Sequence, residues 1–392
     1  MMKKRLSRHF MPAFTTMTLI LFQTKAHAQI TLADTEPDSS GRKWSAYLKG
    51  FIHADAMLDF QKFGAKDGIV APSIIIPQQN SMSSYFSVRQ SQIGLGLKQT
   101  DKNGDSPVNA YIEIDFYGPN GTTTPRLRHG YLQWKKWLIG QTWSNFTDIR
   151  IFPNIFDFNG ANGAMLLRSI QLRYTEKLSD KEALSFSLED PGKISMTVPK
   201  NHPEWKKKSL IPVVTGMYRY GNARDYAKIG ATLSPVNYEN QENEYTKIGF
   251  GGMISFRKHI TNLDDFRFQA SYGKGMARNN IVLSGEGYDA VFDPQKNTAE
   301  MLSLFNILGI YGHWWSSKWS STVYYSYSQV GSSSAIETSL MKRFQNAAIN
   351  LIYHPYRNLR MGMEGNYASA ENFEGMRSDA FRLQFSTSFS FK

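Results

Sequence analysis

The chain has 392 residues and no cysteine, which excludes disulfide bonds, thiolate catalysis and cysteine-bound metals. Its formal net charge is +12, but the basic residues are spread along the chain and do not form the cluster expected of a nucleic-acid-binding protein. No run approaches eighteen consecutive apolar residues, so we expect no transmembrane helix. Aromatic residues make up 14% of the chain, and Tyr and Trp favour the interfacial belts of membrane proteins.

The first 28 residues are predicted to be a secretory signal peptide. A basic start is followed by the short apolar stretch 11–22 and by Ala26-His27-Ala28, the small-x-small pattern that precedes cleavage. A mitochondrial presequence or a frayed helix is the alternative. Residues 29–43 would then be a short periplasmic segment, and 44–392 would form the main domain. The signal holds five basic residues and no acid, so the mature chain would carry a charge of +7.

From residue 44 onward, apolar and polar residues repeatedly alternate, as in strands with one face toward lipid and one toward water. The predicted strands cover residues 44–60, 83–97, 107–117, 126–134, 137–143, 165–178, 181–190, 211–220, 224–234, 245–257, 264–278, 301–314, 318–330, 340–354, 357–370 and 376–391. The last strand is the clearest. Phe381, Leu383 and Phe385 share one parity, whereas Arg382 and Gln384 share the other.

The connections between these strands alternate in length. Tight joints lie at 134–137, 178–182, 220–224, 314–318 and 354–357, and long polar joints lie at 61–82, 144–164, 191–210 and 279–300. Short turns at one end and long loops at the other are typical of bacterial outer-membrane barrels, and about sixteen strands leave an aqueous lumen. We therefore predict an all-β fold, a transmembrane antiparallel β-barrel in the outer membrane of a Gram-negative bacterium, in contact with its lipid.

Other folds and functions fit less well. A β-propeller needs internal repeats, and none is present. A secreted sandwich enzyme rarely needs so many strands joined as hairpins. A lipid-hydrolysing barrel needs an oriented Ser–His pair, but the eight histidines are scattered and no Gly-x-Ser-x-Gly motif occurs. A structural or adhesive barrel with ligand-binding loops remains an alternative.

The period of two assigns many charged side chains to the inner face, because their neighbours of opposite parity are apolar. Those assigned to the lumen are Glu113, Asp115, Arg126, Arg128, Arg173, Arg267, Arg360 and Arg382. Arg89 shares parity with apolar residues such as Leu95, so it faces inward only if a bulge or a subunit interface resets the pattern. An arginine on the lipid face near the bilayer centre costs roughly 2–4 kcal/mol, which favours a lumen position.

Arginines around a lumen indicate a constriction that attracts anions, since a guanidinium matches carboxylates and phosphates. The alternative is that they pair with Glu113, Asp115 and Glu364 and line a water-filled wall without selecting a solute. The residues alone leave both interpretations open. The predicted function is passive diffusion of small hydrophilic solutes, without catalysis and without a cofactor.

The connection 143–163 is richer in Phe and Ile than an exposed surface loop should be. We expect it to fold inward against the barrel wall and to narrow the channel. Its predicted constriction residues are Asp148, Phe152, Phe156 and Asp157. The alternative is an apolar loop that packs at a subunit interface.

Five runs carry a family resemblance. They are Val88-Arg89-Gln90-Ser91-Gln92-Ile93-Gly94-Leu95, Arg126-Leu127-Arg128-His129-Gly130-Tyr131, Gly140-Gln141-Thr142-Trp143-Ser144-Asn145-Phe146, Asp157-Phe158-Asn159-Gly160-Ala161-Asn162-Gly163 and Gln171-Leu172-Arg173-Tyr174-Thr175. Together they resemble the DcaP-like porins of Gram-negative outer membranes over about residues 88–175.

The resemblance implies a sixteen-stranded trimeric porin that takes up small anionic solutes, dicarboxylates among them. The implied lumen arginines are Arg89, Arg126, Arg128 and Arg173. Gln92 stands where the family usually has a second arginine. The segment 29–43 is too short for the N-terminal coiled coil of many members, so a homotrimer would rest on barrel walls alone.

Overall fold

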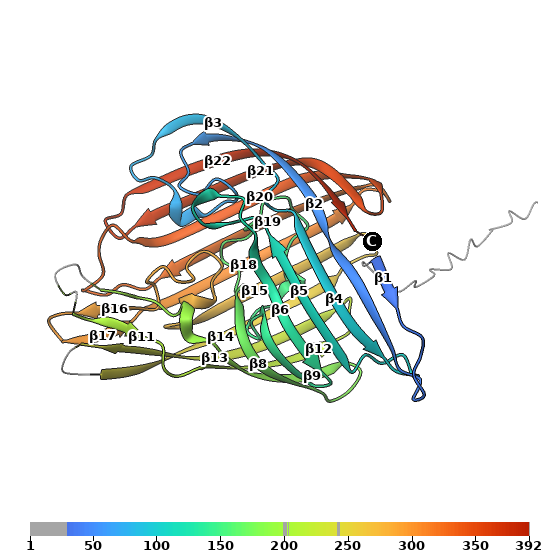
Figure 1. Ribbon diagram of the computed structural model, residues 1–392. Helices are drawn as coiled ribbons and strands as arrows, with labels where there is room; N and C mark the ends of the chain where they lie inside the picture. The colour runs from blue at the N-terminus through green and yellow to red at the C-terminus, as the bar shows by residue number, and fades with distance from the viewer. Residues whose placement is uncertain (1–29, 199–201, 203, 241–243, 392) are drawn as a thin grey trace, which may run out of the picture.

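The computed structural model describes residues 30–198, 202, 204–240 and 244–391. The predicted signal peptide lies outside these residues. The described chain forms a closed barrel of sixteen antiparallel strands, which confirms the predicted fold class (Figure 1). β2 pairs with β22 to close the sheet, with Phe51 opposite Ser390 and Asp59 opposite Arg382.

The strand boundaries follow the predicted alternation closely. The barrel strands are β2 (Lys43–Gln61), β3 (Asn80–Ser87) with β4 (Gln92–Thr100), β5 (Val108–Asp115), β6 (Arg126–Trp134), β7 (Trp137–Trp143), β8 (Arg168–Lys177), β9 (Glu182–Glu189), β12 (Val213–Gly221), β13 (Tyr226–Glu239), β14 (Glu244–His259), β15 (Asp264–Lys274), β18 (Ser303–Trp314), β19 (Trp319–Val330), β20 (Met341–Tyr356), β21 (Leu359–Asn372) and β22 (Arg377–Ser390). β3 and β4 count as one strand because both pair with β2 on either side of a break at 88–91.

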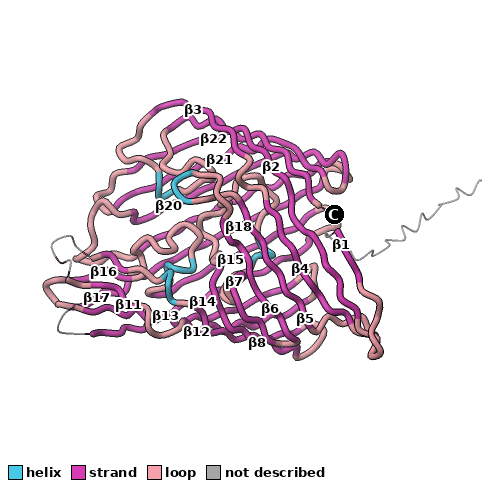
Figure 2. Tube along the Cα trace, viewed as in Figure 1, coloured by secondary structure: helices cyan, strands magenta, loops and turns pink. Residues whose placement is uncertain are grey.

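The remaining elements lie at the two ends of the barrel. β1 (Ile30–Asp34) pairs with β2, and β11 (Lys206–Lys208) pairs with the end of β13. A small sheet of β10 (Met196–Thr197), β16 (Ala290–Asp293) and β17 (Thr298–Met301) lies among the long loops. The helical segments of the described residues are the 3-10 turns Ala71–Ser73, Pro119–Gly121, Ile149–Ile151, Pro191–Lys193 and Ala277–Asn279 (Figure 2). None of the described helices is long and apolar enough to span a membrane.

Side chains alternate between the two faces of the wall. In β22, Phe385 is 50% exposed on the outside, whereas its neighbour Gln384 is 1% exposed inside. The same alternation runs around the barrel, so that large apolar side chains face outward and polar ones are buried inside. This is the inverse of a soluble protein and suits a wall between lipid and an aqueous lumen.

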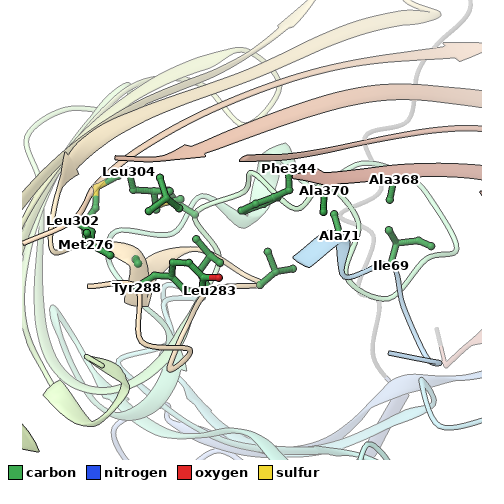
Figure 3. Close-up of a cluster of buried hydrophobic side chains, with 14 of the residues drawn as sticks. Ile69, Ala71, Met276, Leu283, Tyr288, Leu302, Leu304, Phe344, Ala368 and Ala370 are labelled. Carbon is green, nitrogen blue, oxygen red and sulfur yellow. The ribbon is translucent and has the colours of Figure 1, made fainter. Parts of the chain in front are cut away.

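Three loops occupy the interior. They are the first loop (62–79), the third loop (144–167) and the sixth loop (275–302), and we had expected only the third to fold inward. Figure 3 shows Ile69 and Ala71 of the first loop beside Ala368 and Ala370 of β21. In the same cluster, Met276 and other side chains of the sixth loop pack against the wall. Apolar residues are hidden in both loops because each covers a small apolar patch of the inner wall.

Glycines let bulky tyrosines lie flat on the inner wall near the short turns. Tyr47 of β2 pairs in register with Gly96 of β4, and its ring stacks on Tyr111 with centroids 6.2 Å apart. A Cβ atom on Gly96 would lie 2.1 Å from Cζ of Tyr47. The wall therefore has no space for a side chain at this position.

Replacing Gly96 with valine should lower the free energy of unfolding by roughly 1–3 kcal/mol, because the tyrosine must leave its rotamer or the strands must separate. Denaturant unfolding of the detergent-solubilised barrel measures this change. Gly309→Val in β18 is the matched control, since no heavy atom lies within 4 Å of a Cβ there. Equal losses in the two variants would contradict the packing argument.

Candidate functional site

The third loop is held across the barrel by a carboxylate of the opposite wall. Glu364 of β21 accepts the backbone N–H groups of Phe156 and Asp157, each at 2.9 Å, and the side-chain amide of Asn350 at 3.0 Å. Glu364 and Asp157 are both buried. Two backbone donors that would otherwise be orphaned in the lumen are thus satisfied by one anion. The predicted inward fold of this loop has a specific anchor far along the chain.

Further contacts fix both arms of the loop. Asp148 accepts the Tyr226 hydroxyl at 3.1 Å and the Ser255 hydroxyl at 2.5 Å. The Arg267 guanidinium donates to the carbonyl of Phe152. Asp148 and Phe156, two of the predicted constriction residues, are therefore buried anchors of the loop and not exposed rim groups.

Asn162 joins the three inner loops. Its side chain donates to the carbonyl of Ile69 at 2.8 Å and accepts the N–H of Ala71 at 2.7 Å, both in the first loop. Its carbonyl accepts the side-chain amide of Asn280, in the sixth loop, at 2.9 Å. Asp157 adds a second link by accepting the N–H of Ile69 at 2.8 Å. The three loops therefore form one hydrogen-bonded plug along one side of the lumen.

A cavity of about 580 Å³ lies between this plug and the wall of β4 to β8. Its basic lining groups are Arg126, Arg128, Arg168, Lys193 and Arg360. Asp157 is the one acidic residue among the described residues that line it. The loop side is mainly apolar, with Ile149, Phe152 and Phe158. The wall side of the cavity is thus cationic, and the loop side is mainly apolar but also carries Lys193 and Asp157.

Arg126 and Arg128 are paired with wall carboxylates. Both oxygens of Asp115 accept from Arg126, at 3.0 and 2.7 Å. Arg128 donates to Glu113 at 2.9 Å and to Asp115 at 2.8 Å. Asp115 is fully buried behind them, whereas the Arg126 side chain remains 39% exposed. Both interpretations of the arginines therefore apply here: they pair with acids and also line the cavity.

Arg168 and Arg360 line the cavity without a carboxylate partner among the described residues. The Arg168 guanidinium lies 5.3 Å from the Trp143 ring centre, and its buried Nη1 has no hydrogen-bond partner. Arg360 donates to the side-chain oxygen of Asn154 at 2.7 Å and lies 5.1 Å from the Phe156 ring centre. These two side chains give the cavity most of its uncompensated positive charge.

The other predicted arginines lie away from the cavity. Arg382 is fully buried, pairs with Asp59 at 2.5 Å and is covered by Phe63 of the first loop. Arg267 pairs with Asp265. Arg173 is half-buried on the inner face of β8. Arg382 is paired with an acid of the neighbouring strand and Arg267 with an acid two residues away on its own strand, as a buried guanidinium requires.

Arg89 lies at the break between β3 and β4. The irregular backbone at 88–91 resets the parity, and the side chain is 5% exposed. It pairs with Asp67 of the first loop and donates to the carbonyls of Phe116 and Gly118, at 3.2 and 3.0 Å. The arginine thus ties the first loop to the wall.

Arg168 and Lys193 were missed by sequence reasoning. Parity within the predicted strand 165–178 placed Ser169 inward and hence Arg168 outward, but Arg168 is the first residue of β8, where the strand has just left the third loop. Lys193 lies in the connection 190–212, where apolar and polar residues do not alternate regularly. The signals available for the loop side of the cavity were the Phe- and Ile-rich composition of 143–163 and the motif Asp-Phe-Asn-Gly.

The carboxyl group of Asp157 has a perturbed pKa. Burial, followed by the nearby Glu364, raises its pKa to about 7. Asp157 therefore changes charge near neutral pH. No group of three or more His, Asp or Glu side chains within the described ranges is arranged to hold a metal ion.

Comparison with known proteins agrees with this architecture. The family described as DcaP outer membrane protein matches residues 22–391. The chain belongs to this family. A comparison with curated proteins gave no match.

Solved structures share the fold of this DcaP-family barrel. The outer membrane channel DcaP of Acinetobacter baumannii has a TM-score of 0.76 and 24% identity, over 90% of this chain and 99% of that one. OmpT of Vibrio cholerae has a TM-score of 0.54 and 8% identity, over 88% of this chain and 98% of that one. An anion-selective porin from Comamonas acidovorans has a TM-score of 0.54 and 10% identity, over 89% and 100%. The protein is an outer-membrane channel of the porin type.

The charge on Asp157 should make ion selectivity depend on pH. As the pH falls through about 7, its carboxyl group gains a proton and the cavity loses its acidic charge. The anion-to-cation permeability ratio should then rise, which reversal potentials in KCl gradients between about pH 8 and about pH 6 would measure.

The variant Asp157→Asn should flatten this rise, since it carries no charge at either pH. Asp289→Asn is the control, because Asp289 is also buried and its pKa is also raised, to about 6, but it does not line the cavity. A pH step that persists in Asp157→Asn would assign the titration to another group.

Proposed function

We propose that this barrel is a passive diffusion channel for small hydrophilic solutes with a preference for anions, dicarboxylates among them. The observation that supports it is the excess of basic side chains in the cavity, where five basic groups face one carboxyl group. Two of the five are neutralised by Glu113 and Asp115, and Arg168 and Arg360 keep their charge. A confined passage lined by unpaired guanidinium groups attracts carboxylates and repels cations.

The relatives are consistent with this proposal. The Comamonas acidovorans porin of the same fold is described as anion-selective. OmpT of Vibrio cholerae, again of the same fold, is described in a trimer form, and we propose a homotrimer for this chain as well. Apolar outer faces such as Leu95 and Leu97 of β4 would pack on a neighbouring barrel or on outer-membrane lipid.

The predicted export signal, residues 1–28, completes the proposal. It would deliver the chain to the periplasm, and the barrel domain 44–392 would then insert, preceded by the short segment 29–43. In that segment, β1 pairs with β2 beside the end of β22. The segment therefore adds to the periplasmic end of the wall.

Reversal potentials across a planar bilayer test the central proposal. In a KCl gradient, the wild-type channel should show a potential of the sign set by chloride. A potential of the sign set by potassium, or no conductance at all, would refute the proposed anion preference.

Replacing Arg168 with glutamine should lower the anion-to-cation permeability ratio by about sevenfold, because the energies of the anion and the cation change in opposite directions. One unit charge about 7 Å from a passing ion, in a water-like dielectric, contributes roughly the thermal energy. Arg168 leaves no buried acid unpaired when it is removed, unlike Arg126 or Arg128. Arg343→Gln, on the exposed outer rim, is the matched control and should keep the wild-type ratio. A wild-type ratio in Arg168→Gln would show that Arg168 does not act on the permeating ion.

A further inference from the structure

A second group of basic side chains lies on the inner face near the short turns, at the end of the barrel opposite the long loops. Arg219 of β12 is in register with Lys228 of β13, and Arg257 of β14 is in register with Arg267 of β15. Tyr226 lies opposite Arg257. Like charges directly opposite each other destabilise a sheet, so each of these groups needs a partner.

Most of them have one. Arg257 and Arg267 both donate to Asp265. Lys228 donates to the carbonyl of Thr147 at 2.7 Å. The nearby Asp148 is occupied by the hydroxyls of Tyr226 and Ser255.

Arg150 and Arg219 have no carboxylate partner among the described residues. Arg150 belongs to the third loop, and its guanidinium carbon lies 5.8 Å from the centre of the Tyr226 ring. The guanidinium carbon of Arg219 lies 5.1 Å from the same ring centre. Arg219 donates to the carbonyl of Asn222, but its Nε is buried without a hydrogen-bond partner. Two like charges from different elements are thus held beside one ring.

This arrangement is costly unless an anion joins it. Two guanidinium groups and Lys228 lie near a single carboxylate, Asp148, so positive charge remains in excess, and the tyrosine ring compensates only part of it. A carboxylate or a related oxyanion accepts from guanidinium groups in charge-assisted hydrogen bonds and would remove the repulsion. Arg150 is exposed, so such an anion can enter from the aqueous lumen.

Arg150 is also close in the chain to the lining of the cavity. Arg150 stands between Ile149 and Phe152 in the chain, and both of these line the cavity. We infer that Arg150 of the third loop and Arg219 of β12, which both lie beside the Tyr226 ring, form a second binding site for small oxyanions at the periplasmic end of the channel. This inference rests on the proposed anion preference.

Block of the chloride current by sulfate tests the site. The full-length channel is inserted into planar bilayers in one orientation, and sodium sulfate is added to one chamber at a time. In the wild type, sulfate from the short-turn side should block at a lower concentration than sulfate from the long-loop side. In the double variant Arg150→Gln, Arg219→Gln, the half-blocking concentration from the short-turn side should rise by about tenfold, since two charge-assisted hydrogen bonds are lost. Block from the long-loop side should stay unchanged.

Three further variants sharpen the result. Arg219→Lys keeps the charge and should retain most of the block. Arg224→Gln removes a basic side chain from the neighbouring short turn, where it binds Thr261 and Asn262, and should behave as wild type. Arg150→Gln alone changes only an exposed loop side chain, and it decides the question if the double variant fails to fold.

The outcomes separate the two proposals. A wild-type channel that prefers cations refutes the proposed function. An anion-preferring wild type whose sulfate block is the same in Arg150→Gln and in the double variant overturns the second site alone. An equal loss in Arg224→Gln also overturns it, because the effect would then be general electrostatics at the channel mouth.

Discussion

Closure of the sheet between β2 and β22 is the constraint on which the rest of the structure depends. In a bilayer, backbone N–H and C=O groups find no water, so a spanning sheet must leave no open edge. Once the sheet is closed, the period of two places every second side chain inside. The large apolar residues then face lipid, and the charged residues of the wall are brought together in a confined lumen.

In this confined lumen, the effect of an arginine on a passing ion depends on whether the arginine is paired with a carboxylate. Arg126 and Arg128 converge on Asp115, and Arg382 binds Asp59 across the closing seam of the barrel. A buried guanidinium beside a carboxylate contributes little field to a passing ion, since the two charges largely cancel at a distance. The number of inward arginines is therefore a poor measure of selectivity. What counts is the charge left over after pairing, which resides in residues such as Arg168 and Arg360.

This is also where prediction from the sequence reached its limit. The period of two gave the strands, and the strand count gave closure, because both depend on local alternation. Pairing of charged side chains across strands depends on register, that is, on which residues lie opposite each other. The sequence of a single strand does not determine this register. Asp59 was therefore not recognised as the partner of Arg382.

Irregular segments escaped prediction for a related reason. Arg89 faces inward only because the strand is broken between β3 and β4, and the alternation around Arg89 did not predict this break. Arg168 is the first residue of β8, whereas the predicted strand began at residue 165, so the parity assigned within that strand does not hold at Arg168. The aromatic residues of the third loop did announce its inward fold. The first loop is held inside by a few aliphatic contacts of Ile69 and by polar contacts with Arg89 and Asn162, and none of these residues stands out in the sequence as a loop anchor.

These contacts give the wall and the third loop different roles. The basic groups Arg126, Arg128 and Arg168 belong to wall strands, whose positions are fixed by sheet hydrogen bonds. The narrowing comes from the third loop, whose position is fixed by Glu364 and Asn162. Changes in the apolar loop residues, such as Phe152, should therefore alter the width of the passage and leave the sign of its field intact. Conversely, substitutions of charged wall residues should change the electric field in the passage and leave the anchors of the third loop intact. The third loop thus sets the width of the cavity, whereas its charge comes from the wall arginines together with Lys193 and Asp157 of the loops.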